Sequence, residues 1–187
     1  MAESSSKITF RELRIGQAWN LRGNARNGAF ASGVDRLLAT LPVEPLTSTR
    51  RDDAAMLWLG PRSWLFVTGA SSPERDFDAT RIAVNTAGGA LFDVSASYVG
   101  WTIEGEHAAR VLNRECPLDL GEGAFPAGHS AQSTLGHINA MIYRPRDATS
   151  FVVMVARSFA TDAWHLLQAM AATEGHVVEA AVDFAAA

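Results

Sequence analysis

The sequence is poor in several residue types and motifs, and each shortage excludes a class of protein. There is one cysteine, Cys116, so an internal disulfide is excluded and a reducing compartment is expected. Lysine occurs only at Lys7, and the net charge of −4 argues against a nucleic-acid surface. The first residues lack the basic-then-apolar pattern of a signal peptide, and no apolar run is long enough to cross a bilayer. These observations predict a soluble, cytoplasmic protein.

Catalytic and metal-binding motifs are also missing. The sequence has no GxGxxG dinucleotide fingerprint and no assembled Ser–His–Asp motif, and the glycines of Gly121–Gly128 lack the Lys–Ser/Thr ending of a phosphate loop. His129 and His137 are separated by eight positions, with no carboxylate or cysteine at ligand spacing. The remaining histidines read as surface or structural residues: His107, His165 and His176. We therefore expect no metal and no catalytic residue on this chain.

Asp93 is the one carboxylate that invites a binding hypothesis. It ends a predicted strand, where an acid can orient a pterin or an amine. An acid at this position can also cap the backbone of the following turn, and we favour this second interpretation. Cys116 lies at the end of a predicted helix, where the helix dipole would not activate a thiol, so packing is expected. Four of the five tryptophans lie in apolar segments, which favours a core over a flavin or folate pocket.

The residues from Leu91 to Leu120 carry the clearest local pattern. Apolar and other residues alternate from Tyr98 to Glu104, as a half-buried strand requires, and a helix is predicted from Glu106 until Pro117 stops it. A short strand from Leu91 to Asp93 precedes them. The stretch is therefore predicted to be a β-β-α packing module that needs no cofactor.

The remaining elements are predicted in mixed order. Strands are expected at 17–21, 55–59, 64–68, 131–135, 138–143 and 151–156, and helices at 28–40, from a Ser72 cap to about 88, and from a Ser158 cap to Gly175. Seven or eight strands with four helices predict an α+β fold with a mixed, mainly antiparallel sheet and packed helices. We expect a flexible arm over 1–12, a single domain over 13–176 and a tail over 177–187.

Several segments resemble a known family. DVSASYVGWTIEGEHAARVLN (Asp93–Asn113) is similar to a segment of the glycine-cleavage T-protein superfamily, which binds folate. CPLDL (Cys116–Leu120), FPAGHSAQ (Phe125–Gln132) and RSFATDAWHLL (Arg157–Leu167) narrow the resemblance to the gamma subunit of heterotetrameric sarcosine oxidase. LWLGPRSWLFV (Leu57–Val67) resembles the first hairpin of that family. The segments occur in the family's order across residues 17–170.

This resemblance implies a T-protein-like folate-binding domain that serves assembly without a cofactor of its own. The complex that it implies demethylates sarcosine oxidatively to glycine, with hydrogen peroxide and either 5,10-methylenetetrahydrofolate or formaldehyde as products. FAD, FMN, NAD, tetrahydrofolate and zinc are then expected on the alpha, beta and delta subunits. The chain would be part of an oxidoreductase complex without catalytic residues, and the irregular segments 42–53, with Arg50 and Arg51, and 116–130 would dock partners.

Two other functions remain open. A stand-alone folate- or pterin-binding protein would need a concave pocket with a converging carboxylate, for which Asp93 is the candidate. A structural homodimer would instead show self-association that depends on concentration, with neither partner chains nor folate bound.

Overall fold

The computed structural model describes residues 8–145 and 149–184 of the chain. Those residues form two compact units, and each is described by itself. Unit 1 contains residues 8–13 and 99–182, and unit 2 contains residues 14–98 and 183–184. The strands β1 (Ile8–Arg22) and β10 (His176–Asp183) both have residues in each unit. Because these strands run from one unit into the other, the sequence contains no linker-like segment at the points where the units divide. None of the described helices has the length and apolarity to cross a membrane.

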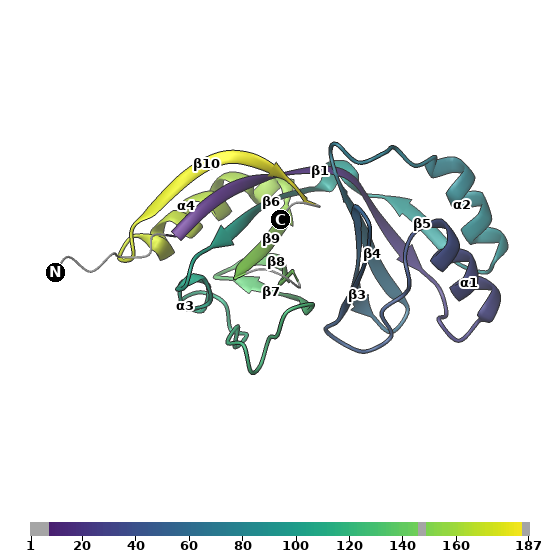
Figure 1. Cartoon of the computed structure of the whole chain (residues 1–187), viewed down its shortest axis with the longest axis horizontal. Helices are drawn as coiled ribbons and strands as arrows, with labels where there is room; N and C mark the ends of the chain where they lie inside the picture. Colours follow the sequence, from purple (N-terminus) through teal and green to yellow (C-terminus); the bar gives the residue numbers. More distant parts are fainter. Residues whose placement is uncertain (1–7, 146–148, 185–187) are drawn as a thin grey trace. The chain divides into compact units, whose positions relative to one another are not determined.

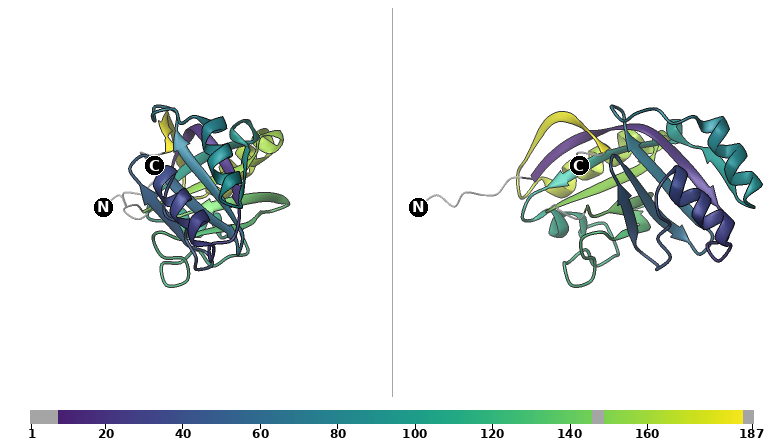
Figure 2. Two further views of the ribbon diagram at one scale, coloured as in Figure 1. Left: turned by 90° about the vertical axis from the view of Figure 1, so that its right-hand side faces the viewer. Right: turned by 45° about the vertical axis from the view of Figure 1, so that its right-hand side comes forward.

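Unit 2 is an antiparallel sheet with two helices on one face (Figures 1 and 2). Its strand order is β2 (Ser48–Arg51), β3 (Ala54–Gly60), β4 (Ser63–Gly69), β1 and β5 (Ala90–Asp93). The helices are α1 (Gly28–Leu37) and α2 (Phe77–Thr86). Both helices place apolar side chains on Trp19, Trp64 and Phe66 of the sheet, so this face holds the core of the unit.

Polar side chains set the beginnings of both helices in unit 2. The Asn27 side chain accepts hydrogen bonds from the backbone N–H groups of Ala29 and Phe30, at 3.0 and 3.4 Å. Asp76 accepts from the N–H of Ala79 at 2.9 Å, so the N-cap of α2 lies four residues after the predicted Ser72 cap. Residues 73–76 are not helical, so the free N–H groups of the first turn begin after Asp76, whose side chain caps one of them.

Unit 1 is a sheet that packs against two other helices. Its order is β7 (Ser130–Leu135), β8 (Ile138–Tyr143), β9 (Ser150–Ala156), β6 (Tyr98–Glu104), β1 and β10. The helices are α3 (Ala108–Leu112) and α4 (Ala160–Ala171). Ile103, Val153 and Leu167 are fully buried in one apolar cluster with Cys116, and this cluster is the core of the unit. Short 3₁₀ turns lie at Arg157–Phe159 in unit 1 and at Ser95–Ser97 in unit 2.

The fold is the predicted α+β class, and the described residues form ten strands where seven or eight were expected. The additional strand residues lie at the two ends of the chain and in the connection after α1. Residues 8–12 of the expected arm begin β1, and residues 177–183 of the expected tail form most of β10, while 1–7 and 185–187 lie outside the described residues. Arg50 and Arg51, expected in an irregular connection, belong to β2.

The predicted bounds of both helices in unit 1 are wrong. The helix expected from Glu106 to Cys116 is the five-residue α3, followed by turns in which Cys116 N–H still donates to Leu112 O at 2.9 Å. Ser158 does not cap the last helix, because it lies in a 3₁₀ turn and α4 starts after Phe159 with no side-chain cap. Gly175 does not end the last helix either, because α4 stops at Ala171 and turns over residues 172–174 lead to Gly175, which has φ of +74°.

Candidate functional site

Asp93 is the last residue of β5, opposite Trp19 of β1 in unit 2. Its Oδ1 accepts hydrogen bonds from the backbone N–H of Ser95 at 2.9 Å and from the Ser95 hydroxyl at 2.6 Å. The Ser95 hydroxyl also lies 2.9 Å from the N–H of Ala18, which donates to it. Asp93 therefore caps the turn after β5 and ties that turn to β1, which is the role that the sequence favoured.

A polar cavity of about 590 Å³ lies beside Asp93, entirely within unit 2. The acidic lining residues come from β5 and from the start of α2: Glu74, Asp76, Asp78 and Asp93. Trp19 also lines the cavity but is only 1% exposed, so its ring offers little open surface to a ligand. Asp78 pairs with Arg81 at 2.9 Å, but the lining still holds more carboxylates than arginines, so the cavity favours a positively charged polar group over a flat aromatic one.

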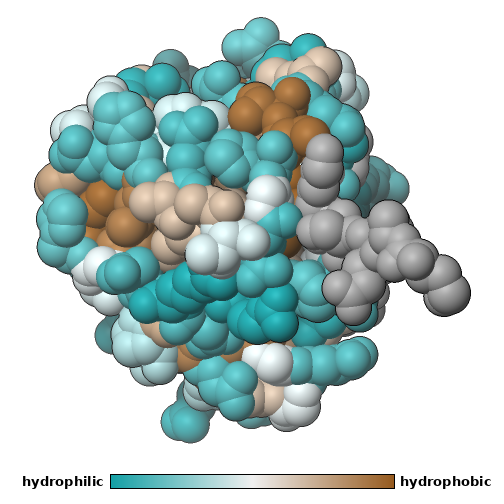
Figure 3. Space-filling model, turned by 90° about the vertical axis from the view of Figure 1, so that its left-hand side faces the viewer, coloured by the Kyte–Doolittle hydropathy of each residue, from teal (hydrophilic) through white to brown (hydrophobic). Residues whose placement is uncertain are grey.

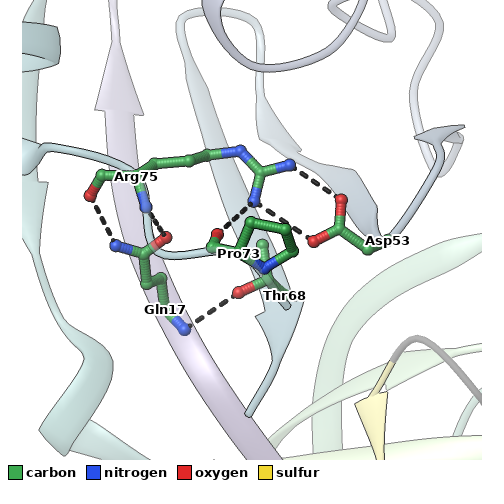
Figure 4. A network of polar contacts seen from close by, with 5 residues as sticks. All are labelled: Gln17, Asp53, Thr68, Pro73 and Arg75. Atoms are coloured by element: carbon green, nitrogen blue, oxygen red, sulfur yellow. Dashed lines mark hydrogen bonds and ion pairs between the residues drawn. The ribbon is translucent and has the colours of Figure 1, made fainter. Parts of the chain in front are cut away.

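The one arginine that lines this cavity, Arg75, is already engaged (Figure 4). Its guanidinium donates to the two Asp53 oxygens at 2.8 and 3.3 Å and to the carbonyl of Pro73 at 3.4 Å. The Gln17 side chain donates to Arg75 O at 2.8 Å and accepts from Arg75 N–H at 3.1 Å, which fixes the backbone as well. Arg75 therefore supports the wall of the cavity and does not neutralise its acids.

This network has an electrostatic consequence for Asp53. Hydrogen bonding from Arg75, followed by hydrogen bonding from Ser72, lowers the pKa of the Asp53 carboxyl from 3.8 to about 2. The Arg75 guanidinium also lies 5.2 Å from the centre of the Phe66 ring, so its charge faces an aromatic surface on that side. Nothing in the sequence around SSPERD signals this network, because its members come from three separate segments.

A second ionic network in unit 2 holds Asp183. The Asp183 carboxylate accepts from the hydroxyl of Ser71, from the N–H of Ser71 at 3.0 Å and from Arg14 Nε at 2.8 Å. Hydrogen bonding from Ser71 and then Arg14 lowers the pKa of Asp183. The arrangement joins the beginning and the end of the chain's part in unit 2, which indicates a structural role.

The other residues singled out by the sequence do not come together in a site. Cys116 is 4% exposed in the core of unit 1, with Sγ 3.7 Å from the hydroxyl of Ser133. His129 packs edge-on against Phe125 and His176 against Phe10, at ring separations of 5.6 and 5.5 Å. Across residues 8–145 and 149–184, no three histidine, cysteine or acidic side chains gather as a metal site.

The tryptophans divide between the two cores. Trp19 and Trp64 are 1% exposed and pack in unit 2, as the sequence predicted. Trp101 and Trp164 stack in unit 1 with ring centres 5.9 Å apart and an interplanar angle of 19°. Trp58 is half-buried at the edge of the unit 2 core. Their packing accounts for their positions without a cofactor.

The fold is that of the T-protein class. The chain aligns with a chain of the glycine cleavage system aminomethyltransferase T from Bartonella henselae at a TM-score of 0.60 and 12% identity, covering 94% of this chain and 48% of that one. It aligns with a chain of heterotetrameric sarcosine oxidase from Corynebacterium sp. U-96, in complex with pyrrole 2-carboxylate, at a TM-score of 0.75 and 22% identity, covering 94% and 91%.

The sequence comparison identifies the family within this class. Residues 22–173 match the sarcosine oxidase, gamma subunit family, and the chain belongs to that family. It is also 27% identical over 172 residues to the sarcosine oxidase subunit gamma of Corynebacterium sp. strain P-1, covering 89% of this chain and 82% of that protein. The family that the five sequence segments resemble is thereby confirmed.

Proposed function

We propose that the chain is a non-catalytic gamma subunit of a heterotetrameric sarcosine oxidase, with a role in assembly and stability. The observation that carries the proposal is the family match over residues 22–173, together with the named relative over most of its length. Its partners are the alpha, beta and delta subunits, and the complex is cytoplasmic. FAD, FMN, NAD, tetrahydrofolate and zinc are bound by those partners in a reaction that converts sarcosine to glycine.

The chemistry of the described residues supports a role without turnover. The acidic cavity beside Asp93 contains carboxylates but no cysteine, histidine or lysine among its lining residues. Its lining hydroxyl, that of Ser95, is held in the turn by Asp93 Oδ1 and by the N–H of Ala18. Asp93 itself is occupied by the turn that it caps. These features favour a scaffold over a reactive centre.

The surface supports association with other chains. Large apolar side chains are exposed in both units, among them Val43 at 65%, Ile82 at 61% and Val178 at 58%. Figure 3 shows one face on which apolar side chains gather in separate patches among hydrophilic ones. Exposed apolar patches rimmed by polar residues are typical of subunit contacts.

Co-purification from the native host tests this function. A tagged chain is expected to bring down yellow, flavin-containing alpha and beta chains together with delta, and the isolated material should produce peroxide when sarcosine is added. The chain expressed alone should fold but show no turnover. Recovery of a folded, colourless chain without partners would contradict the proposal.

A stand-alone folate- or pterin-binding protein is the second function, and its support is limited to the Asp93 carboxylate, which lines the cavity of about 590 Å³ and could pair with pterin amino groups. Under this alternative, tetrahydrofolate binds the isolated chain in the micromolar range, and Asp93→Asn weakens it because a carboxylate that pairs with the pterin amino groups is lost. Calorimetry on both variants distinguishes this function from the first, which expects no binding.

A further inference from the structure

A second cavity of unit 2 has a different chemistry from the acidic one. It has a volume of about 490 Å³ and lies between the turn before α1, the connection after α1 and the β3–β4 hairpin. We call it the arginine–tryptophan cavity, after the four residues that carry the argument: Arg26, Trp58, Arg62 and Trp64. Val43 also lines it. Its volume falls in the range of cavities that bury a small molecule or an anchoring side chain.

Hydrogen bonds to the backbone hold the walls of this cavity in place. The Trp64 indole N–H donates to the carbonyl of Pro42 at 2.8 Å, and Trp64 is 1% exposed. The N–H of Trp58 donates to Thr47 O at 3.1 Å, so the connection is tied to the hairpin at two points. On the other side, Arg26 N–H donates to the Asn24 side chain at 3.0 Å. A cavity with fixed walls needs little ordering when it binds.

The cavity carries two arginines and no carboxylate among its lining residues. Arg62 Nε donates to Gly23 O at 3.3 Å, which orients the guanidinium and leaves its two terminal nitrogens for another acceptor. In the part of the chain that the structure describes, Arg26 and Arg62 make no ion pair, whereas Arg51, Arg75 and Arg81 each pair with an aspartate. A guanidinium fork with free donors is the preferred partner of a carboxylate.

Apolar surface adjoins these charges. Val43 is 65% exposed, Leu46 on the same connection is 40% exposed, and Trp58 is half-buried. Tryptophan and arginine beside exposed aliphatic side chains are the residue types that dominate binding energy at protein interfaces. The lining therefore fits an occupant that combines a carboxylate with an apolar or aromatic group.

We propose that the arginine–tryptophan cavity docks a segment of a partner subunit in which an aspartate or glutamate lies beside an apolar or aromatic side chain. This inference rests on the proposed function and names the chemistry of one docking site. Charge complementarity commits the occupant to an acidic segment, because a basic one would face two arginines without a counter-charge. Of the two docking segments that the sequence suggests, only 42–53 contributes to this cavity.

Assembly of the co-expressed complex tests the site. Arg62→Ala and the double variant Arg26→Ala/Arg62→Ala should raise the dissociation constant for the partner chains by about tenfold or more, as expected for interface hot spots. Arg62→Lys should recover part of the loss, since it keeps the charge but not the fork. Arg36→Ala is the matched control, because Arg36 is an exposed arginine of α1 outside this cavity.

The salt dependence of association with the partner chains is a second measurement. It would not change if the two arginines only stabilised the fold of this chain. Association of the unsubstituted chain should weaken as salt rises, and the double variant should show a smaller salt slope. Unchanged assembly in the double variant, or an equal loss in Arg36→Ala, would overturn the inference while leaving the subunit function intact. Binding of benzoate to the isolated chain can be followed by tryptophan fluorescence. If benzoate binds in a way that depends on Arg62 while the Arg62 variants assemble normally, the inference is also overturned, and the cavity is assigned to a free carboxylate.

Discussion

At the scale of single residues, the ionic side chains of unit 2 fall into two groups. Arg75 and Asp53 are each less than a quarter exposed and form hydrogen bonds in a fixed geometry. Arg26 and Arg62 are exposed, and no ion pair among the described residues occupies them. The first group contributes to the stability of the unit because its charges are paired and partly shielded from water. The second group is available to a ligand.

The pKa of Asp53 predicts a stability change in acid. Its folded value of about 2 lies below the value of 3.8 without the network, so the stabilisation is complete above about pH 4 and is lost as the pH falls through 2. Asp53→Asn should therefore destabilise the chain at pH 7 by about 2 kcal/mol at most and should flatten the pH dependence between pH 4 and 2. Urea unfolding across this pH range measures both effects.

The neighbouring carboxylate supplies the control for this change. Asp52 has φ of +51°, a conformation that asparagine tolerates, and it forms no ion pair among the described residues. Asp52→Asn should leave the stability at pH 7 within about 0.5 kcal/mol. An equal loss in both variants would show that the Asp53–Arg75 pair is not the source of the effect.

At the scale of elements, close backbone contact between β6 and its neighbours in unit 1 depends on Gly100. A Cβ at this position would lie 2.7 Å from Val153 O and 2.9 Å from the Met154 side chain. Val153 and Met154 belong to β9, which adjoins β6 in the sheet. Packing therefore explains why glycine occupies position 100, within the family-like segment of residues 93–113, since a larger residue would force β6 and β9 apart.

Gly100→Ala is expected to destabilise the chain by about 1–3 kcal/mol, the usual range for overpacking a close contact. The measurement is the midpoint of thermal or urea unfolding. Gly123→Ala is the control, because Gly123 is exposed and a Cβ there would meet nothing within 4 Å. If both variants unfold at the same midpoint as the unsubstituted chain, the contact with Val153 does not limit packing.

At the scale of the whole molecule, each unit has its own apolar core and its own pair of α-helices. The surface carries exposed valine, isoleucine and phenylalanine side chains in addition to arginines. A chain of this composition is suited to lasting contact with other chains, because stable interfaces combine apolar area with arginine. These features support the proposed role in assembly.

This role predicts the effect of changing Asp93 in the assembled complex. Asp93→Asn keeps an oxygen that can accept from Ser95, so the turn should survive and sarcosine-dependent peroxide production should stay within about twofold. The measurement is the initial rate of the purified complex at saturating sarcosine. A tenfold drop with assembly intact would show that the carboxylate takes part in the reaction.

Local pattern in the sequence was sufficient for several elements and one site residue. The strand from Tyr98 to Glu104 has its predicted bounds, because alternation of period two is a local property of a strand. It is not half-buried as predicted, since Gly100 and Thr102 on its second face are buried as well. The strand at 138–143 was likewise predicted at its observed bounds. Asp93 caps its turn because its partner, Ser95, is two positions away.

Tertiary structure decided what distant residues do together. Residues 8–12 look polar and loose in the sequence, yet Arg11 in β1 pairs with Glu104 and Glu179 of unit 1 at 2.5 Å. Residues 177–183, which the sequence suggested to be a tail, are part of β10, which pairs with β1. The Gln17–Arg75–Asp53 network and the arginine–tryptophan cavity join residues tens of positions apart. Periodicity reports only on near neighbours, so contacts between segments distant in the chain are established by the folded sheet alone.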